Sequence, residues 1–121
     1  MLFVIGRDKK IMKKFNEKNY KEVLDTNKTA MIFFTSAGCH LCVKLKPIVA
    51  SLEKTHKSLS FYSCDINKEK KLAKVFLKDE GVPTGFVARE GSLFKIKDPE
   101  SPDDDSWYSK KYLEELIEAL Q

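Results

Sequence analysis

The stretch Ala30-Met-Ile-Phe-Phe-Thr-Ser-Ala-Gly-Cys-His-Leu-Cys42 decides the fold of this chain. Its apolar run, Met31–Phe34, predicts a buried strand, and the residues that follow it, Thr35–Gly38, predict a turn. Helical periodicity begins at about residue 40, so both cysteines stand where a strand gives way to a helix. A Cys-x-x-Cys at such a junction, within a βαβ pattern, is typical of a redox-active pair.

The start of a helix favours the charged form of a cysteine. Backbone N–H groups in the first turn have no intrahelical partner, and the helix dipole adds partial positive charge there. Such surroundings lower the pKa of a cysteine from about 8.5 to between about 3.5 and 7.5. We therefore expect Cys39 to be the exposed nucleophile and Cys42, one turn further in, to resolve a mixed disulfide. A protonated His40, beside Leu41 in the intervening dipeptide, would favour the Cys39 thiolate further.

Two other interpretations of the cysteine pair stay open: inert structural cysteines, and half of a zinc site. A structural zinc ion normally takes four ligands. The remaining soft candidates are Cys64, His40 and His56, and they form no second closely spaced pair. The sequence therefore predicts no metal, and the redox interpretation is favoured over both alternatives.

Composition indicates one globular domain. The chain has 121 residues, of which 42% are hydrophobic, enough for a single core. Its net charge of +4 is spread along the chain, which argues against nucleic-acid binding. It has no apolar run long enough to span a membrane, and Met1–Ile5 is too short for a signal sequence. We expect a cytoplasmic, monomeric protein with an extension at residues 1–9 and one domain at 10–121, or an extracytoplasmic one if a leader is missing.

Hydrophobic periodicity and turn residues predict the other elements. An edge strand at Lys10–Phe15 and a helix at Glu17–Leu24, capped by Asn16, precede the cysteine stretch. The elements expected after the turn at Thr35–Gly38 are a helix at about 40–55 that Pro47 kinks, a strand at Leu59–Asp65, a helix at Lys68–Lys78 with Leu72, Val75 and Phe76 on its apolar face, strands at Gly85–Arg89 and Leu93–Ile96 joined by a Glu90-Gly91 hairpin, and a helix at Ser109–Leu120.

Two features outside the cysteine pair receive a structural interpretation. Lys97–Ser106 holds five acidic residues and is expected to be a solvated loop, with a docking surface for a basic partner as the alternative. Cys64, next to Asp65 at a strand end, is expected to be a small buried hydrophobe, with a third redox thiol as the alternative.

From about residue 10 to 120 the chain resembles the thioredoxin family. Five features together carry the resemblance: the strand Met31–Phe34, the motif Cys39-His-Leu-Cys42, Pro47 eight residues after the first cysteine, Val82-Pro83-Thr84, and the Glu90-Gly91 hairpin. The resemblance implies an α/β thioredoxin fold, a central mixed β-sheet with helices on both faces.

The resemblance also implies site roles. It implies that Pro83 is a cis-proline packed beside the disulfide, and that the backbone at Val82 pairs with an extended substrate segment. Gly38 stands where typical thioredoxins have tryptophan, which opens the approach to Cys39. The family's buried acid is replaced by Phe33, and its lysine partner falls near Ser63.

The function implied is a thiol–disulfide oxidoreductase in electron transport and cell redox homeostasis. It would act on protein disulfides, use a thiol reductant or reductase as its partner, and need no cofactor beyond the Cys39–Cys42 couple. A histidine between the cysteines resembles more oxidising relatives, because it stabilises the reduced form. The alternative is a non-catalytic adaptor that binds a partner through the groove near Cys39 and Pro83.

Overall fold

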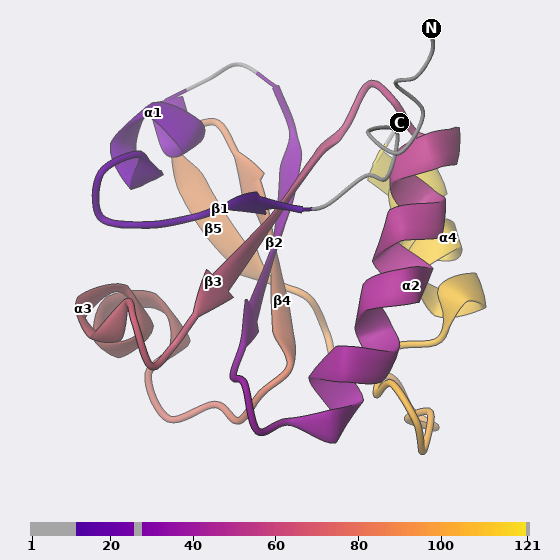
Figure 1. Ribbon diagram of the computed structural model, residues 1–121. Coiled ribbons are helices and arrows are strands. Elements are labelled where there is room, and N and C mark those ends of the chain that lie inside the picture. Colours follow the sequence, from indigo (N-terminus) through magenta and orange to yellow (C-terminus); the bar gives the residue numbers. More distant parts are fainter. Residues whose placement is uncertain (1–11, 26–27, 121) are drawn as a thin grey trace, which may run out of the picture.

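The structure, a computed structural model, describes residues 12–25 and 28–120. Five strands form one sheet in the order β1-β3-β2-β4-β5. β1, β3 and β2 pair in parallel, whereas β4 pairs antiparallel with both β2 and β5. The mixed central sheet that the sequence predicts is therefore confirmed (Figure 1). The strands are β1 (Lys13–Lys14), β2 (Ala30–Thr35), β3 (Ser60–Asp65), β4 (Thr84–Arg89) and β5 (Ser92–Lys95).

Helices cover both faces of this sheet, as predicted. Figure 1 shows α2 and α4 on one side of the strands and α1 and α3 on the other. Among the described residues, no helix is long and apolar enough to cross a membrane. The helices are α1 (Tyr20–Asp25), α2 (His40–Thr55), α3 (Lys70–Leu72), which continues into the π-helical turn η2 (Ala73–Leu77), and α4 (Lys110–Leu120).

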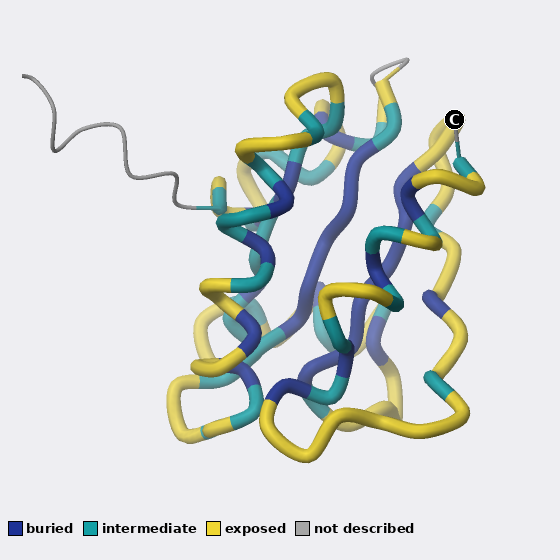
Figure 2. Tube along the Cα trace, turned by 90° about the vertical axis from the view of Figure 1, so that its right-hand side faces the viewer, coloured by how far each residue is buried: buried dark blue, intermediate teal, exposed yellow. Residues whose placement is uncertain are grey.

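Strand β2 lies at the centre of the molecule and is buried on both faces. Met31 and Phe33 point into a cluster with residues of α2 and α4. Ile32 and Phe34 point the other way, into a cluster with Phe15 and residues of α1, α3 and η2. A strand covered on both sides has no polar face, which explains its uninterrupted apolar run. Figure 2 shows the buried residues as a layer through the middle of the molecule.

The third helix differs from its prediction at Lys68–Lys78. Backbone N–H groups of Lys68 and Glu69 donate to the carbonyl of Asp65, so a turn occupies the expected first helical residues. After α3 the chain widens into η2, where the N–H of Lys78 donates to the carbonyl of Ala73, five residues earlier. The widened turn matters because it changes which side chains face the sheet.

The prediction that Val75 belongs to the apolar face of this helix is wrong. Val75 is 59% exposed, whereas Leu72 and Leu77 are each 4% exposed. A spacing of five residues brings two side chains to one face when the turn is π-helical, whereas an α-helix brings together residues three or four apart. The π-turn therefore turns Leu77 inward and Val75 outward.

The other elements lie close to their predicted positions. The Asn16 side chain accepts hydrogen bonds from the N–H groups of Lys18 and Asn19, although the helix itself begins only at Tyr20. Glu90 and Gly91 both have positive φ, 51° and 84°, as a two-residue hairpin turn requires. The helix α2 continues through Pro47. The described part of the predicted edge strand forms a strand at Lys13–Lys14. Its residues 10 and 11, like the predicted extension at 1–9, lie outside the described residues.

Candidate redox-active site

The two cysteines lie where β2, through a short turn, reaches the start of α2. Cys39 is the N-cap of α2, with extended backbone angles (φ −92°, ψ 107°), and its Sγ accepts a hydrogen bond from the N–H of Cys42 at 3.1 Å. The two residues form a disulfide, with 5.2 Å between their Cα atoms. An amide N–H aimed at Sγ, together with the helix dipole, is the arrangement that stabilises a thiolate on Cys39 once the disulfide is reduced.

The two sulfurs differ in accessibility. Cys39 is half-buried, whereas Cys42 is 2% exposed and belongs to the buried face of α2. An attacking thiol must reach a disulfide in another molecule, but a resolving thiol needs only to reach its neighbour. The difference in burial suits Cys39 for attack and Cys42 for resolution, the order that the sequence predicts.

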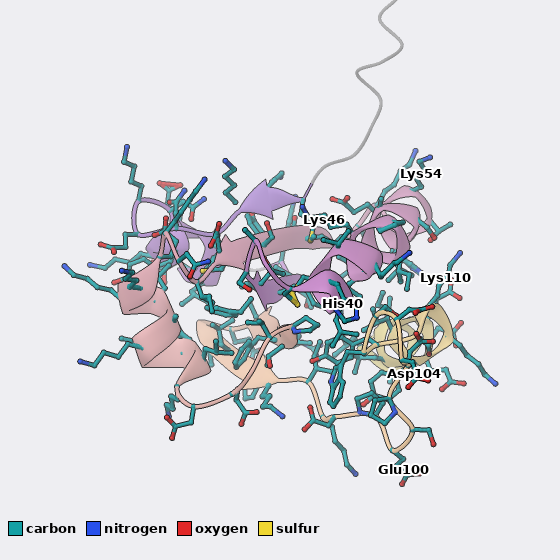
Figure 3. All side chains as sticks on the ribbon, turned by 60° about the horizontal axis from the view of Figure 1, so that its bottom comes forward. His40, Lys46, Lys54, Glu100, Asp104 and Lys110 are labelled. Carbon is teal, nitrogen blue, oxygen red and sulfur yellow. A yellow bond between two sulfur atoms is a disulfide. The ribbon has the colours of Figure 1, made fainter. Side chains whose placement is uncertain are left out.

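The residues that frame the cysteines are more open. Gly38 is exposed in the turn before Cys39, His40 is the exposed first residue of α2, and Leu41 is half-buried. Figure 3 shows the disulfide close to His40, with Glu100 and Asp104 of the loop after β5 on the same side of the molecule. The tuning roles of His40 and Leu41, and the binding role of Gly38, stay predictions.

The loop before β4 forms the opposite wall of the site. The Val82–Pro83 peptide bond is cis, and the carbonyl oxygen of Val82 lies 3.8 Å from the Sγ of Cys39. The hydroxyl of Thr84 donates to the carbonyl of Gly81 at 2.6 Å and closes this loop on itself. The resemblance placed a cis-proline beside the disulfide, and the structure places Pro83 there.

Phe33 and Ser63, which occupy the family's positions for a buried acid and its lysine partner, lie opposite each other on neighbouring strands. Phe33 of β2 pairs in register with Ser63 of β3 on one side and with Gly85 of β4 on the other. Phe33 is completely buried and belongs to the core beneath α2. An aromatic ring and a serine thus occupy the two positions, so this pair supplies no carboxylate for proton transfer with Cys42.

Sequence reasoning missed Tyr108, which is completely buried and closes the inner side of the loop before β4. Its hydroxyl accepts a hydrogen bond from the N–H of Gly85 at 2.8 Å. Burial, the main cause, raises the pKa of Tyr108 to about 12. The available signal was Trp107-Tyr108, two aromatic residues that directly follow the acidic loop. That loop is mostly exposed, as predicted, but its last residue, Ser106, is buried.

Cys64 is fully buried in the cluster on the α1 side of the sheet, in keeping with its interpretation as a small hydrophobe. Burial, and then the nearby Glu69 and Asp65, raise the pKa of its thiol from 9.0 to about 12. Because a neutral thiol is a poor nucleophile, Cys64 is unsuited to exchange chemistry.

We expect Cys64 in the oxidised, folded protein to resist alkylation by iodoacetamide at pH 8 and to react fully in denaturant. The pKa of this thiol is higher in the folded protein than in the unfolded chain. The contribution of the neutral Cys64 thiol to the free energy of unfolding is therefore complete below pH 9 and is lost as the pH rises toward 12. Mass spectrometry of alkylated protein measures the reaction. Rapid labelling of the native protein would contradict the burial of this thiol.

In the described part of the chain, no three His, Cys, Asp or Glu side chains cluster in a way that could hold a metal ion. The zinc interpretation of the cysteine pair therefore finds no further ligands among these residues. The chemistry that the site can support is exchange between a dithiol and a disulfide.

The comparisons with known proteins agree with this geometry. The family model described as Thioredoxin matches residues 11–107. Thioredoxin H3 from Arabidopsis thaliana is 29% identical over 73 residues, which are 60% of this chain and 61% of that protein. The match thus spans less than two thirds of this relative.

Solved structures share the fold. The oxidised form of mitochondrial thioredoxin 3 from Saccharomyces cerevisiae superposes with a TM-score of 0.72 at 22% identity, over 90% of this chain and 94% of the other. Plasmodium falciparum thioredoxin gives a TM-score of 0.74 at 16% identity, over 92% and 100% of the two chains. Since the family model covers most of the chain, including the cysteine pair and the cis-proline, this protein belongs to the thioredoxin family.

Proposed function

We propose that this protein is a thiol–disulfide oxidoreductase that acts on protein disulfides. Family membership and a Cys-x-x-Cys pair at bonding distance support exchange chemistry in general. The position of Cys39 carries the finer proposal. Cys39 is half-buried, its sulfur accepts the N–H of Cys42, and the carbonyl oxygen of Val82 lies 3.8 Å from that sulfur.

The reaction has two exchange steps. The Cys39 thiolate attacks one sulfur of the substrate disulfide, so a mixed disulfide forms and the first substrate thiolate leaves. The Cys42 thiolate then attacks Sγ of Cys39, which releases the second substrate thiolate and forms the Cys39–Cys42 disulfide. Two electrons pass from the protein to the substrate, and each departing thiolate takes a proton from water.

The pair needs a second reaction to be restored. A thiol reductant or reductase must return two electrons to the Cys39–Cys42 disulfide, and the sulfurs themselves carry the electrons without a metal or organic cofactor. We propose that Val82 offers its backbone to an extended substrate segment, since it lies directly across from Cys39 and precedes the buried Pro83.

Reduction of insulin tests the proposal. With dithiothreitol as electron donor, the wild-type protein is expected to shorten the lag before the insulin B chain precipitates, and turbidity measures this. Cys64→Ala is the matched control, because it removes the cysteine that lies outside the site, and it should keep wild-type activity. If the wild type gives no acceleration but its Cys39–Cys42 disulfide can be reduced, the proposal is wrong and the adaptor function is favoured.

A further inference from the structure

The hydrogen bond between Gly85 and Tyr108 replaces a missing strand contact. Gly85 lies at the second position of β4, and its carbonyl accepts the N–H of Ile96 at 2.9 Å. The regular pairing of β4 with β5 ends at Phe86 and Lys95. At Gly85 the hydroxyl of Tyr108, 23 residues later, accepts the N–H that a strand carbonyl would otherwise accept.

The surroundings of Gly85 are tightly packed. A Cβ added to Gly85 would lie 2.8 Å from Ile96 Cδ1 and 2.8 Å from Phe33 Cε1. Side chains therefore close tightly around this residue. Leaving a buried amide without an acceptor is costly, so we expect the backbone at Gly85 to shift when the Tyr108 hydroxyl is removed.

Tyr108 itself is held firmly in place. Its ring packs edge-on against Phe33, with 6.0 Å between ring centroids, and stacks on Tyr112. The hydroxyl of Ser106, which is buried, donates to the carbonyl of Tyr108 at 2.9 Å. The Tyr108 hydroxyl, which accepts the Gly85 N–H, is therefore held in a fixed position although Tyr108 is distant from Gly85 in the sequence.

The Gly85 amide is close in sequence to the backbone that faces the reacting sulfur. Gly85 is two residues after Pro83 and three after Val82, whose carbonyl faces the Sγ of Cys39. The Thr84 hydroxyl secures the near side of this loop to Gly81. The Tyr108 hydroxyl secures its far side, where the loop enters β4.

We propose that Tyr108 is a positioning residue that fixes the Val82–Pro83 backbone for pairing with a protein substrate. This inference rests on the proposed function, in which Val82 binds the substrate backbone. Tyr108 touches neither the substrate nor the sulfurs. It acts through Gly85, so its loss affects the binding of an extended polypeptide more than exchange at Cys39.

Tyr108→Phe removes the hydroxyl and keeps the ring. We expect its KM for a protein disulfide to rise about tenfold, the factor that corresponds to one lost hydrogen bond, with a much smaller change in kcat. With dithiobis(nitrobenzoate), a small disulfide without a backbone to pair with Val82, the loss should be smaller. The small-disulfide rate also shows whether the variant is folded.

Tyr112→Phe is the matched control. Tyr112 stacks on Tyr108, but its hydroxyl donates to the carbonyl of Lys97, away from Gly85. This variant should keep the wild-type KM. Hydrogen exchange at the Gly85 amide, followed by NMR, should accelerate in Tyr108→Phe and remain unchanged in Tyr112→Phe.

The outcomes separate this inference from the function it builds on. A wild type that reduces neither disulfide overturns both. A wild type that reduces both disulfides, with an unchanged KM in Tyr108→Phe or with equal rises in KM in the two tyrosine variants, overturns the positioning role alone. Equal losses on the protein and the small disulfide also overturn it, because they indicate damage to the cysteine pair.

Discussion

Replacing Cys39 with serine is expected to reduce disulfide exchange to the uncatalysed rate, while Cys42→Ser should accumulate a stable mixed disulfide with the substrate. A serine hydroxyl stays protonated at neutral pH and does not attack a disulfide, so the first variant loses the opening step. The second variant keeps a reactive sulfur at the N-cap of α2 but lacks the buried thiol that releases the substrate.

Mass spectrometry of each variant, incubated with a disulfide-containing peptide, distinguishes the two roles. Cys42→Ser should gain the mass of one peptide half, and dithiothreitol should remove it. Cys39→Ser should remain unmodified at neutral pH, because its remaining site thiol, Cys42, is buried. Adding Cys64→Ala to both variants keeps the third cysteine from contributing. Equal, full activity of the two serine variants in insulin reduction would contradict the assignment.

Phe33→Ala is expected to lower the free energy of unfolding by about 3–5 kcal/mol, which is a large fraction of the stability of a small domain. Phe33 is completely buried, lies between Ser63 and Gly85 in the sheet, and packs against Tyr108. Removing its ring leaves a cavity under α2, and the strands on both sides cannot close it without losing their register. Denaturant unfolding, followed by circular dichroism, measures the change.

Phe94→Ala is the matched control for this substitution. Phe94 is the same residue type on the edge strand β5, but it is 57% exposed. Its replacement should change the free energy of unfolding by about 0.5 kcal/mol, as is usual for a surface position. Similar losses for the two phenylalanines would mean that Phe33 does not have the central packing role described above.

The aromatic residue at position 33 also affects the chemistry. The resemblance implied a carboxylate at this position, and here neither Phe33 nor its register partner Ser63 can take or give a proton at neutral pH. The proton of Cys42 must then move through water or another group. His40 is a candidate, since it is exposed beside the disulfide.

The sequence by itself determined the central strand, the cysteine pair at the helix start and the fold class. These depend on local patterns: an apolar run that needs cover on both faces, a helix start beside Cys39, and a Glu90-Gly91 turn that demands positive φ. Each of these signals lies within a few neighbouring residues. Each can therefore be recognised without knowing how the chain folds back on itself.

Only the tertiary structure decided the π-turn η2 and the place of Tyr108. Periodicity predicted Val75 on the buried face, because one extra residue in a helical turn leaves no distinct mark in the composition. Tyr108 meets Gly85 only because β5 ends its pairing early and the chain after the acidic loop returns to the sheet. A hydrogen bond between residues 23 positions apart depends on this return, which no local pattern encodes.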